Sequence, residues 1–340
     1  MGGAALQEST PTCTVIGAGS WGTALAIQLA RKGCPTRLWG RDADAIAAMR
    51  RRRENRRYLP DIGFPGPLTL EPDLDAALAD TELVLMVTPS HAFAETLEQI
   101  RPMIDSNRGV AWASKGFEPG SGRLLHQVAA DILGSDAPLA VATGPSFARE
   151  VALDLPTAIV VASPSDDYAR LVAGALHGGN FRAYSSNDII GAELGGAVKN
   201  VLAIGTGLCD GIGLGHNSRA ALITRGLAEM MRLAEAMGAT RQTLMGLSGM
   251  GDLVLTCTGD LSRNRRFGLA LGQGSTRAQA LEEIGQVVEG IGAAEEVVRL
   301  ARKHAIELPI AECVFAILTD RITPEQGVDL LLSREPKRES

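Results

Sequence analysis

Hydrophobic and polar positions divide the chain into two parts with different patterns. In the first part, short apolar runs alternate with helical patterns, and the runs predict strands over 12–16, 36–39, 83–87, 109–113, 139–142 and 158–162. Most of the runs are near-continuously apolar, which is typical of strands buried on both faces of a parallel sheet. The first part therefore predicts an α/β fold with a doubly wound sheet that helices cover on both faces.

The second part of the chain shows helical periodicity only. Helices are predicted over 186–205, 217–237, 243–258, 262–272, 276–285, 292–304, 310–320 and 324–332. Pro309 and Pro324 stand where helices begin, as is usual for proline. We therefore expect two domains with a boundary close to residue 188: an α/β domain over 11–188 and an all-α domain over 189–333.

A glycine-rich segment, GAGSWG, follows the first predicted strand and leads directly into a helical pattern. Gly17 permits a tight turn, Gly19 lets the backbone approach a pyrophosphate, and Gly22 lets helix and strand pack closely. The free N–H groups at the start of the helix face the phosphates. The flanking strand and helix favour a Rossmann-type dinucleotide site over a plain glycine-rich turn.

The residue after the second strand bears on which dinucleotide binds. Arg41 stands where an NAD enzyme usually carries an acidic residue for the ribose 2′-hydroxyl. A guanidinium suits a 2′-phosphate, because it offers planar, charge-assisted donors and keeps its proton. We expect NADP (as NADPH) to be the preferred cofactor, with NAD as the second. Two alternatives stay open, namely that Asp42 turns inward to the ribose or that Arg41 is a solvated loop residue.

Composition narrows the class of protein. The 340 residues suit two domains, and 45% hydrophobic with 21% charged residues is typical of a globular protein. A net charge of −6 disfavours a nucleic-acid partner. Five widely spaced cysteines favour reduced thiols over disulfides or a metal site. Without an apolar N-terminal stretch or a run of about 18 apolar residues, we expect a cytoplasmic chain with no signal peptide and no membrane span.

Two polar residues follow predicted strands on the side where open α/β sheets bind ligands. Lys115 comes after the strand at 109–113, and Ser146 comes after the strand at 139–142. We expect both to lie where a substrate meets the nicotinamide. The alternative is that they are loop residues in contact with water.

Lys199 is the candidate general acid and base. Its neighbours three and four residues away on the predicted helix are glycine, leucine and alanine, so no carboxylate of the same helix pairs with it. Glycines inside a helix cost stability, which indicates a close approach in front of the lysine. Apolar surroundings lower the pKa of a lysine from about 10.4, which suits proton exchange with a carbonyl oxygen or a hydroxyl. The alternative is a lysine that extends along the helix to solvent.

Two further segments of the helical part carry candidate ligands. Asp252 precedes an apolar run and either caps a helix, binds a substrate hydroxyl or orients Lys199. Ser262 can cap a helix whose first turn contains three arginines and an asparagine. Cations at a helix N-terminus oppose the helix dipole, so this turn predicts a phosphate pocket for the substrate. A basic surface turn neutralised by Asp260 is the alternative.

The chain resembles the bacterial NAD(P)-dependent glycerol-3-phosphate dehydrogenases over about residues 11–332. The resemblance rests on VIGAGSWGTALA, WASKGFEPGSGRLL, ATGPSFARE, ELGGAVKNVLAIGTGLCDGIGLGHNSRAALITRGLAEM, GMGDLVLTCTGDLSRNRRFG and IGQVVEG. It implies reversible reduction of dihydroxyacetone phosphate, a small phosphorylated triose, to sn-glycerol 3-phosphate for glycerophospholipid synthesis. It also implies a homodimer.

The resemblance further implies roles for individual residues. Contacts with the cofactor are implied for Ser20, Trp21, Arg41, Lys115, Ala148, Arg263, Val287 and Glu289. Contacts with the substrate are implied for Lys115, Gly144, Ser146, Lys199, Asp252, Ser262, Arg263 and Asn264. Lys199 would be the proton acceptor. Asp42 and Ile291-Gly292 depart from forms common in the family, which leaves the cofactor preference open.

Two other functions are compatible with this order of domains. β-Hydroxyacid and 6-phosphogluconate-type dehydrogenases also carry a lysine in the first helix of the second domain, but the basic turn after Ser262 favours a triose phosphate. A non-catalytic NADP sensor predicts loss of Lys199 or of the basic turn, and both are present.

Overall fold

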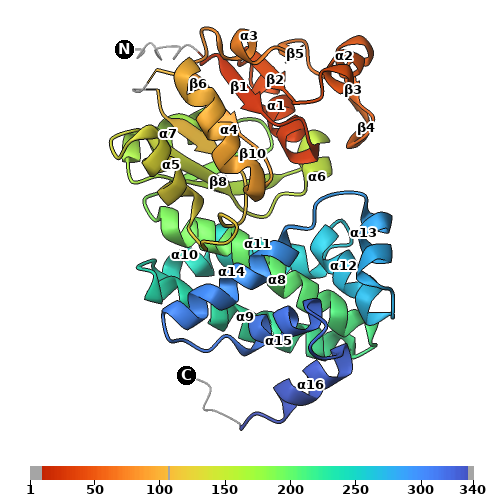
Figure 1. Cartoon of the computed structure of the whole chain (residues 1–340). Helices are drawn as coiled ribbons and strands as arrows, with labels where there is room; N and C mark the ends of the chain where they lie inside the picture. The colour runs from red at the N-terminus through yellow and green to blue at the C-terminus, as the bar shows by residue number, and fades with distance from the viewer. Residues whose placement is uncertain (1–9, 106–107, 336–340) are drawn as a thin grey trace, which may run out of the picture.

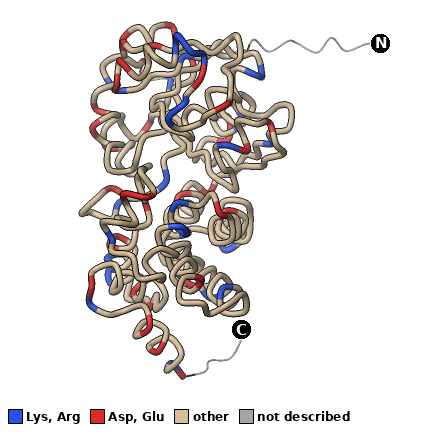
Figure 2. Tube along the Cα trace, turned by 90° about the vertical axis from the view of Figure 1, so that its right-hand side faces the viewer, with Lys and Arg blue, Asp and Glu red and all other residues tan. Residues whose placement is uncertain are grey.

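The computed structural model describes residues 10–105 and 108–335, so residues 1–9, on which the expectation of no signal peptide partly rests, lie outside it. Two halves are stacked end to end, with a sheet and its helices above and a bundle of helices below (Figure 1). A view turned by 90° shows the same two bodies, with basic and acidic residues interspersed over both (Figure 2).

An eight-stranded sheet forms the centre of the upper half. Its strands are β1 (Cys13–Ile16), β2 (Thr36–Trp39), β5 (Leu68–Glu71), β6 (Leu83–Met86), β7 (Val110–Trp112), β8 (Leu139–Thr143), β9 (Thr157–Ala162) and β10 (Phe181–Ser186). Their order is β10-β9-β8-β7-β6-β1-β2-β5, and all neighbours are parallel except β8 and β9. A separate hairpin consists of β3 (Glu54–Asn55) and β4 (Leu59–Gly63).

Helices cover both faces of the sheet, because successive residues of a strand point to opposite sides. On one face lie α1 (Ser20–Arg31), α2 (Ala43–Arg52), α6 (Ala148–Ala152) and α7 (Asp166–Leu176). On the other lie α3 (Leu74–Leu78), α4 (Phe93–Ile100) and α5 (Leu125–Leu133). Within β6, Leu85 packs with the first group and Met86 with the second. The predicted Rossmann-type fold is confirmed.

The structure differs from the predicted sheet near its edges. β5 and β10 were not predicted, because each mixes apolar with polar or exposed positions and lacks a continuous apolar run. β9 runs antiparallel to β8, although the pattern predicts a parallel sheet. Between them lies only α6, which at five residues is too short to return the chain to the starting edge of the sheet.

The lower half is built around α8 (Ile189–Gly211). The other helices are α9 (Gly215–Ala236), α10 (Arg241–Met245), α11 (Asp252–Thr258), α12 (Arg263–Gly272), α13 (Arg277–Ile284), α14 (Glu289–Lys303), α15 (Pro309–Leu318) and α16 (Pro324–Leu332). Asp188 caps α8 by accepting the N–H of Gly191 at 2.8 Å. The predicted all-α domain is confirmed, and we propose its boundary at Asp188.

α8 also has the length and hydropathy of a membrane-spanning helix, whereas the sequence predicted no such segment. The most apolar window of α8 is 94% buried inside the protein. Its hydrophobic residues pack against the surrounding helices of the bundle. This burial is the property of a core helix, so α8 is only weak evidence for a membrane span.

One predicted helix is broken in the structure. The pattern predicts a helix over 243–258, but α10 ends at Met245 and a π-helical turn, Leu247–Gly251, precedes α11. A Cβ added at Gly249 would lie only 2.1 Å from the carbonyl oxygen of Leu244, so this close turn requires a glycine. Asp252 thereby becomes the first residue of α11.

Glycines set the distance between α8 and α12. The facing residues are Gly207 and Gly211 on α8 and Gly268 and Gly272 on α12. A Cβ added at Gly207 would lie 2.0 Å from the carbonyl oxygen of Arg265. The two backbones therefore touch, and this contact fixes the N-terminal end of α12 relative to α8.

Candidate active site

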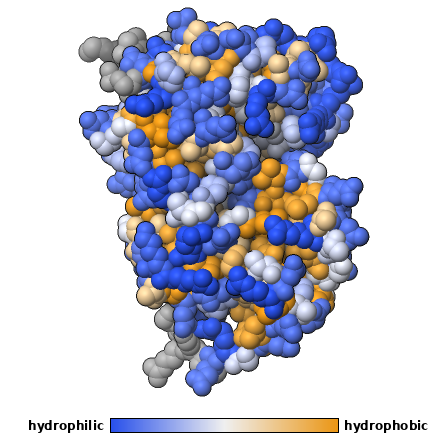
Figure 3. Space-filling model, viewed as in Figure 1, coloured by the Kyte–Doolittle hydropathy of each residue, from blue (hydrophilic) through white to orange (hydrophobic). Residues whose placement is uncertain are grey.

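A cavity of about 1350 Å³ lies between the two halves. The upper half contributes the turn after β1, the ends of β2, β6 and β7 and the β3–β4 hairpin. The lower half contributes residues of α8 and segments around Ser262 and Val287. The space-filling view shows hydrophobic residues on both sides of the narrowing between the halves (Figure 3). The cavity thus meets the carboxyl ends of the parallel strands, where such sheets bind ligands.

The three glycines after β1 have different surroundings. Gly17 has φ +117°, and a Cβ there would lie 2.5 Å from the carbonyl oxygen of Val87. A Cβ at Gly22 would lie 1.9 Å from the carbonyl oxygen of Gly17, so both glycines are required by the fold itself. A Cβ at Gly19 would meet no atom within 4 Å. Gly19 therefore faces open space at the start of α1, where helix N–H groups lack intrahelical partners.

Arg41 and Asp42 both line the cavity but differ in their contacts. Asp42 is the N-cap of α2, and its Oδ1 accepts the N–H of Ala45 at 3.0 Å. Arg41 is exposed and makes no ion pair with any residue that the structure describes. The helix cap therefore uses the carboxylate, while the guanidinium is free to bind a ligand.

Two buried polar atoms at this cavity have no hydrogen-bond partner among the described residues, Trp21 Nε1 and Thr88 Oγ1. Trp21 lies in the first turn of α1, and Thr88 follows β6 at the edge of the sheet. A buried donor without a partner is costly, so both atoms indicate a ligand. Together with the open Gly19, they fit a dinucleotide that extends along the glycine-rich turn.

Asp252 joins two lysines that come from different halves of the molecule. Lys199 Nζ, on α8, donates to Asp252 Oδ1 and to Thr256 Oγ1, the latter at 2.8 Å. Lys115 Nζ, beyond β7, donates to Asp252 Oδ2 at 2.7 Å and to the carbonyl oxygen of Gly144 at 3.3 Å. Asp252 does not act as an N-cap, because it is the first helical residue and both its oxygens bind ammonium groups.

Burial and charge shift the pKa values of this group in opposite directions. Burial lowers the pKa of Lys199 to about 7, with Asp252 opposing and Lys115 adding to the shift. Burial acts to raise the pKa of Asp252, but Lys115 and Lys199 outweigh it and hold that pKa below its usual value. Lys199 can therefore gain or lose a proton near neutral pH beside a carboxylate that stays ionised.

The glycines beside Lys199 serve packing inside the protein. A Cβ at Gly195 would lie 2.2 Å from the carbonyl oxygen of Ser248 in the π-helical turn. A Cβ at Gly196 would lie 3.0 Å from Thr143 Oγ1. The close approach predicted in front of Lys199 is thus made by segments of this chain. Lys199 has no carboxylate partner on its own helix because its partner is Asp252, the first residue of α11.

The arginines of the predicted phosphate turn point in different directions. Ser262 caps α12, as predicted, by accepting the N–H of Arg265 at 3.2 Å. The Arg265 side chain is buried and pairs with Asp210 at 2.7 Å and with Asp260 at 2.8 Å. Arg263 lines the cavity and donates to Gln286 Oε1 at 3.2 Å. Asp260 therefore neutralises Arg265, while Arg263 remains for a ligand.

The other residues of the turn are held by neighbouring helices. Asn264 Nδ2 donates to Asn200 Oδ1, and Asn264 Oδ1 accepts the N–H of Gly290, both at 2.9 Å. Glu289, at the start of α14, accepts the Ser90 hydroxyl at 2.8 Å. The latter contact joins the two halves at the side of the cavity.

The structure brings most of the predicted site residues to one cavity. Those that line it are Gly17, Gly19, Ser20, Trp21, Gly22, Arg41, Lys115, Ser146, Ala148, Lys199, Ser262, Arg263, Asn264, Val287 and Glu289. Gly144 and Asp252 do not line it, but both accept hydrogen bonds from Lys115 Nζ. Their roles stay predictions.

Sequence reasoning missed several residues at the cavity. Thr256 lies four residues after Asp252 on α11, so helical spacing offered a signal for it. Asn200 directly follows Lys199, and adjacent residues of a helix do not face each other, so helical spacing from Lys199 offered no signal for it. The hairpin from Glu54 to Pro60 carried no motif. No group of three or more His, Cys, Asp or Glu side chains within residues 10–105 and 108–335 is arranged to hold a metal ion. All five cysteines are free thiols.

Comparison with known proteins covers both halves. Residues 12–169 match the family model described as the NAD-dependent glycerol-3-phosphate dehydrogenase N-terminus, and residues 188–329 match the C-terminus of the same family. A protein of Xanthomonas oryzae pv. oryzae named glycerol-3-phosphate dehydrogenase (NAD(P)+) is 60% identical over 334 residues, 98% of each chain. A protein of Stenotrophomonas maltophilia with the same name is also 60% identical over 334 residues and 98% of each chain.

Solved structures give the same result. A glycerol-3-phosphate dehydrogenase of Coxiella burnetii superposes with a TM-score of 0.92 at 49% identity, covering 96% of this chain and 99% of that one. The enzyme of the same name from Saccharomyces cerevisiae gives 0.81 at 26% identity, covering 94% and 99%. A D-mandelate dehydrogenase at 12% identity and a TM-score of 0.59 shares the fold alone.

Proposed function

This chain belongs to the NAD-dependent glycerol-3-phosphate dehydrogenase family, and we propose that its cavity carries out the reversible, NAD(P)H-dependent reduction of dihydroxyacetone phosphate to sn-glycerol 3-phosphate. The observation that carries the proposal is the group formed by Lys115, Asp252 and Lys199. It lies between a glycine-rich turn that fits a dinucleotide and a helix N-terminus that fits a phosphate.

Lys199 is the proposed proton donor in the direction of reduction. A dinucleotide whose pyrophosphate is held at the glycine-rich turn would supply the hydride from its nicotinamide, and the carbonyl oxygen of the substrate also needs a proton. A pKa near 7 lets Lys199 give up this proton and regain it at neutral pH. Asp252 and Thr256 hold its Nζ in place, and Lys115 adds a second positive charge for the developing negative oxygen.

The first turn of α12 is the proposed site of the substrate phosphate. Arg263 uses one of its N–H groups on Gln286 and keeps the others for a ligand. Asn264 likewise keeps one of its two amide hydrogens. The free backbone N–H groups at this helix start add to these donors. The Arg265 contacts with Asp210 and Asp260 hold the turn without competing for the phosphate.

NADPH is the proposed preferred cofactor, with NADH as the second. Asp42 is engaged by the N–H of Ala45, so the acidic residue at this position is already used by the helix. The free guanidinium of Arg41 suits a 2′-phosphate. Ala148, Val287, Glu289 and Trp21 complete the proposed cofactor contacts. We further propose a cytoplasmic homodimer that supplies glycerophospholipid synthesis.

A turnover assay tests the proposal directly. Dihydroxyacetone phosphate should cause loss of nicotinamide absorbance with NADPH and more slowly with NADH. Lys199→Ala should reduce turnover by about a thousandfold and leave NADPH affinity nearly unchanged. Lys303→Ala removes an exposed lysine at the end of α14 and serves as the control. A wild-type protein that binds NADPH but does not turn over the substrate would contradict the proposed reaction, and a fully active Lys199→Ala would contradict the role of Lys199.

A further inference from the structure

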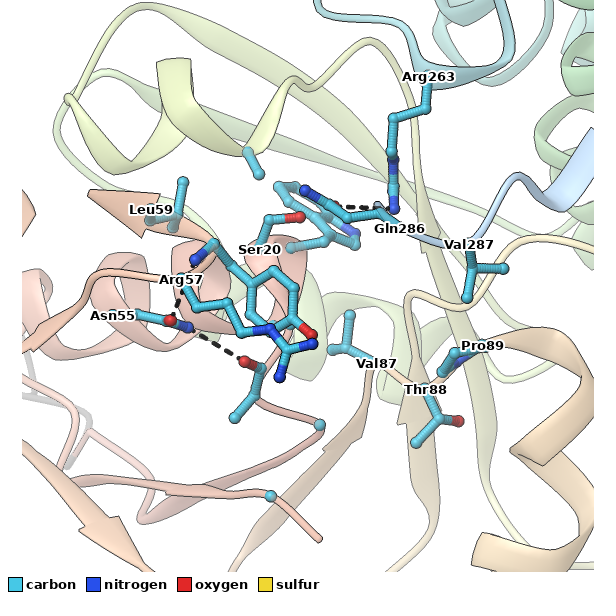
Figure 4. Close-up of a pocket in the computed structure, with 18 of the residues that line it drawn as sticks. Ser20, Asn55, Arg57, Leu59, Val87, Thr88, Pro89, Arg263, Gln286 and Val287 are labelled. Atoms are coloured by element: carbon cyan, nitrogen blue, oxygen red, sulfur yellow. Dashed lines mark hydrogen bonds between the residues drawn. The ribbon is translucent and has the colours of Figure 1, made fainter. Parts of the chain in front are cut away.

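The β3–β4 hairpin forms a wall of the cavity that no sequence motif marks. It lies outside the eight-stranded sheet, and the segment from Glu54 to Pro60 lines the cavity. In the close-up, Asn55 and Arg57 lie on the side opposite Arg263 (Figure 4). The hairpin and the phosphate turn of the helical half therefore face each other across the cavity.

Asn55 connects this hairpin to the glycine-rich turn. Its side chain is 2% exposed, and its Nδ2 donates to the carbonyl oxygen of Ala18 at 3.1 Å and to Thr23 Oγ1 at 2.8 Å. Its Oδ1 accepts the N–H of Tyr58 at 3.3 Å. Ala18 stands between the first two glycines of the turn. Asn55 thereby fixes the tip of the hairpin relative to the backbone that a dinucleotide approaches.

The two arginines at the tip of the hairpin differ in their contacts. Arg56 Nε pairs with Glu54 at 3.1 Å. The Arg57 guanidinium lies 5.1 Å from the centroid of the Tyr58 ring. Within the part of the chain that the structure describes, Arg57 makes no ion pair. Arg57 thus presents a positive charge at the cavity that no carboxylate of the hairpin neutralises.

The chemistry of an uncompensated guanidinium at this place indicates an anionic ligand. Its planar donors form charge-assisted hydrogen bonds with phosphate oxygens. The attraction between this guanidinium and the Tyr58 ring does not use its N–H groups, so they stay available to a ligand. The pyrophosphate of either dinucleotide and the 2′-phosphate of NADP are both groups of this kind.

On the premise of the proposed dinucleotide site, we propose that Arg57 binds a phosphate group of the cofactor from the hairpin side of the cavity and that Asn55 is the positioning residue that holds Arg57 there. Arg57 acts directly on the ligand. Asn55 acts through its hydrogen bonds with Ala18, Thr23 and the backbone of Tyr58.

Direct binding measurements on the full chain test the role of Arg57. NADPH and NADH are titrated by calorimetry into the wild type, Arg57→Ala and Arg57→Lys. The control is Arg51→Ala, which removes an exposed arginine of α2 that does not line the cavity. Arg57→Ala should weaken NADPH binding by at least about tenfold, because a hydrogen bond to a charged group is lost. Arg57→Lys should recover part of the loss, and Arg51→Ala should bind as the wild type does.

The two cofactors identify which phosphate is bound. An equal loss with NADPH and NADH assigns Arg57 to the pyrophosphate, and a loss with NADPH alone assigns it to the 2′-phosphate. Unchanged binding by Arg57→Ala, in a wild type that binds either cofactor, would overturn the inference and leave the proposed function intact. A wild type that binds neither cofactor would overturn the proposed function first.

A double-mutant cycle tests the positioning role of Asn55. Asn55→Ala should weaken NADPH binding nearly as much as Arg57→Ala, and the double variant should be little worse than either single variant. Losses that simply add would show that Asn55 acts independently of Arg57 and would overturn the positioning role. Circular dichroism of Asn55→Ala checks that the sheet remains folded, and Arg57→Ala, at an exposed position, tests the main claim without that risk.

Discussion

The two walls of the cavity are built in different ways. In the sheet half, the proposed dinucleotide site is centred on backbone within the six residues from Gly17 to Gly22, which fold locally between a strand and a helix. In the helical half, Lys199 and Asp252 stand 53 residues apart and meet only because α8 and α11 pack together. Consecutive residues thus specify the glycine-rich part of the first wall, whereas tertiary packing specifies the Lys199–Asp252 pair of the second.

Gly19 in the sheet half and Gly207 in the helical half differ in a related way. Gly19 has open space where a Cβ would be, so its side of the cavity is free for a ligand. A Cβ at Gly207 would lie 2.0 Å from the backbone carbonyl oxygen of Arg265, so glycine at this position allows α8 and α12 to pack closely. A substitution at each position should therefore affect binding in one half and folding in the other.

Gly207→Ala should have the largest effect, a loss of folding stability in the helical half. The added methyl group would collide with the backbone of Arg265, which cannot move without separating α12 from α8. Overpacking against backbone should lower the free energy of unfolding by more than about 3 kcal/mol. Chemical denaturation monitored by circular dichroism measures this loss.

Gly292→Ala is the matched control for that substitution. Gly292 also lies within a helix, α14, but a Cβ there would meet no atom within 4 Å. Alanine favours helices over glycine by up to about 1 kcal/mol, so this variant should be as stable as the wild type or slightly more stable. Equal losses at positions 207 and 292 would contradict the role of glycine packing between α8 and α12.

Asp252→Asn should have the next largest effect, on catalysis. Loss of the carboxylate leaves Lys199 beside Lys115 without a counter-charge, so the pKa of Lys199 should fall below its value of about 7. Reduction needs protonated Lys199, so kcat should decline at a lower pH than in the wild type. At neutral pH we expect a loss of about 100-fold, equivalent to about 2.7 kcal/mol.

The pH profile separates this role of Asp252 from a structural one. Oxidation of glycerol 3-phosphate needs the neutral amine, so it should lose less activity than reduction does. NADPH affinity should hardly change, since Asp252 does not line the cavity. Equal losses in both directions with an unshifted profile would show that Asp252 does not set the protonation of Lys199.

The sequence was informative where function depends on neighbouring residues. The strand-turn-helix around Gly17, the helical nature of the second half and the cap at Ser262 were all predicted, because each follows from local spacing. The hairpin at Asn55 was not predicted, since two short strands with exposed residues give no apolar pattern. The role of Asp252 stayed open for another reason, because only the packing of α11 on α8 shows what its carboxylate contacts.

Some local signals were present and were interpreted incompletely. The paired glycines of α8 and α12 recur at intervals of four, a spacing that indicates close helix packing, but only Gly195 and Gly196 were used in the sequence-based prediction, which did not say which part of the molecule approaches them. The arginines after Ser262 suggested one phosphate pocket, whereas Arg265 turns inward to Asp210. Residue type alone does not distinguish a binding arginine from a buried ion pair.

Gly19→Ala should have the smallest effect in free energy, and it should act on cofactor binding and not on folding. Gly19 has φ −74°, which alanine adopts without strain, and its Cβ would project into open space. Stability should stay within about 0.5 kcal/mol of the wild type. A methyl group where the pyrophosphate approaches should weaken NADPH and NADH binding alike, by about tenfold or 1.4 kcal/mol. Binding as in the wild type would mean that the dinucleotide does not approach the backbone at Gly19, and a loss of stability would mean that this glycine serves the fold as Gly207 does.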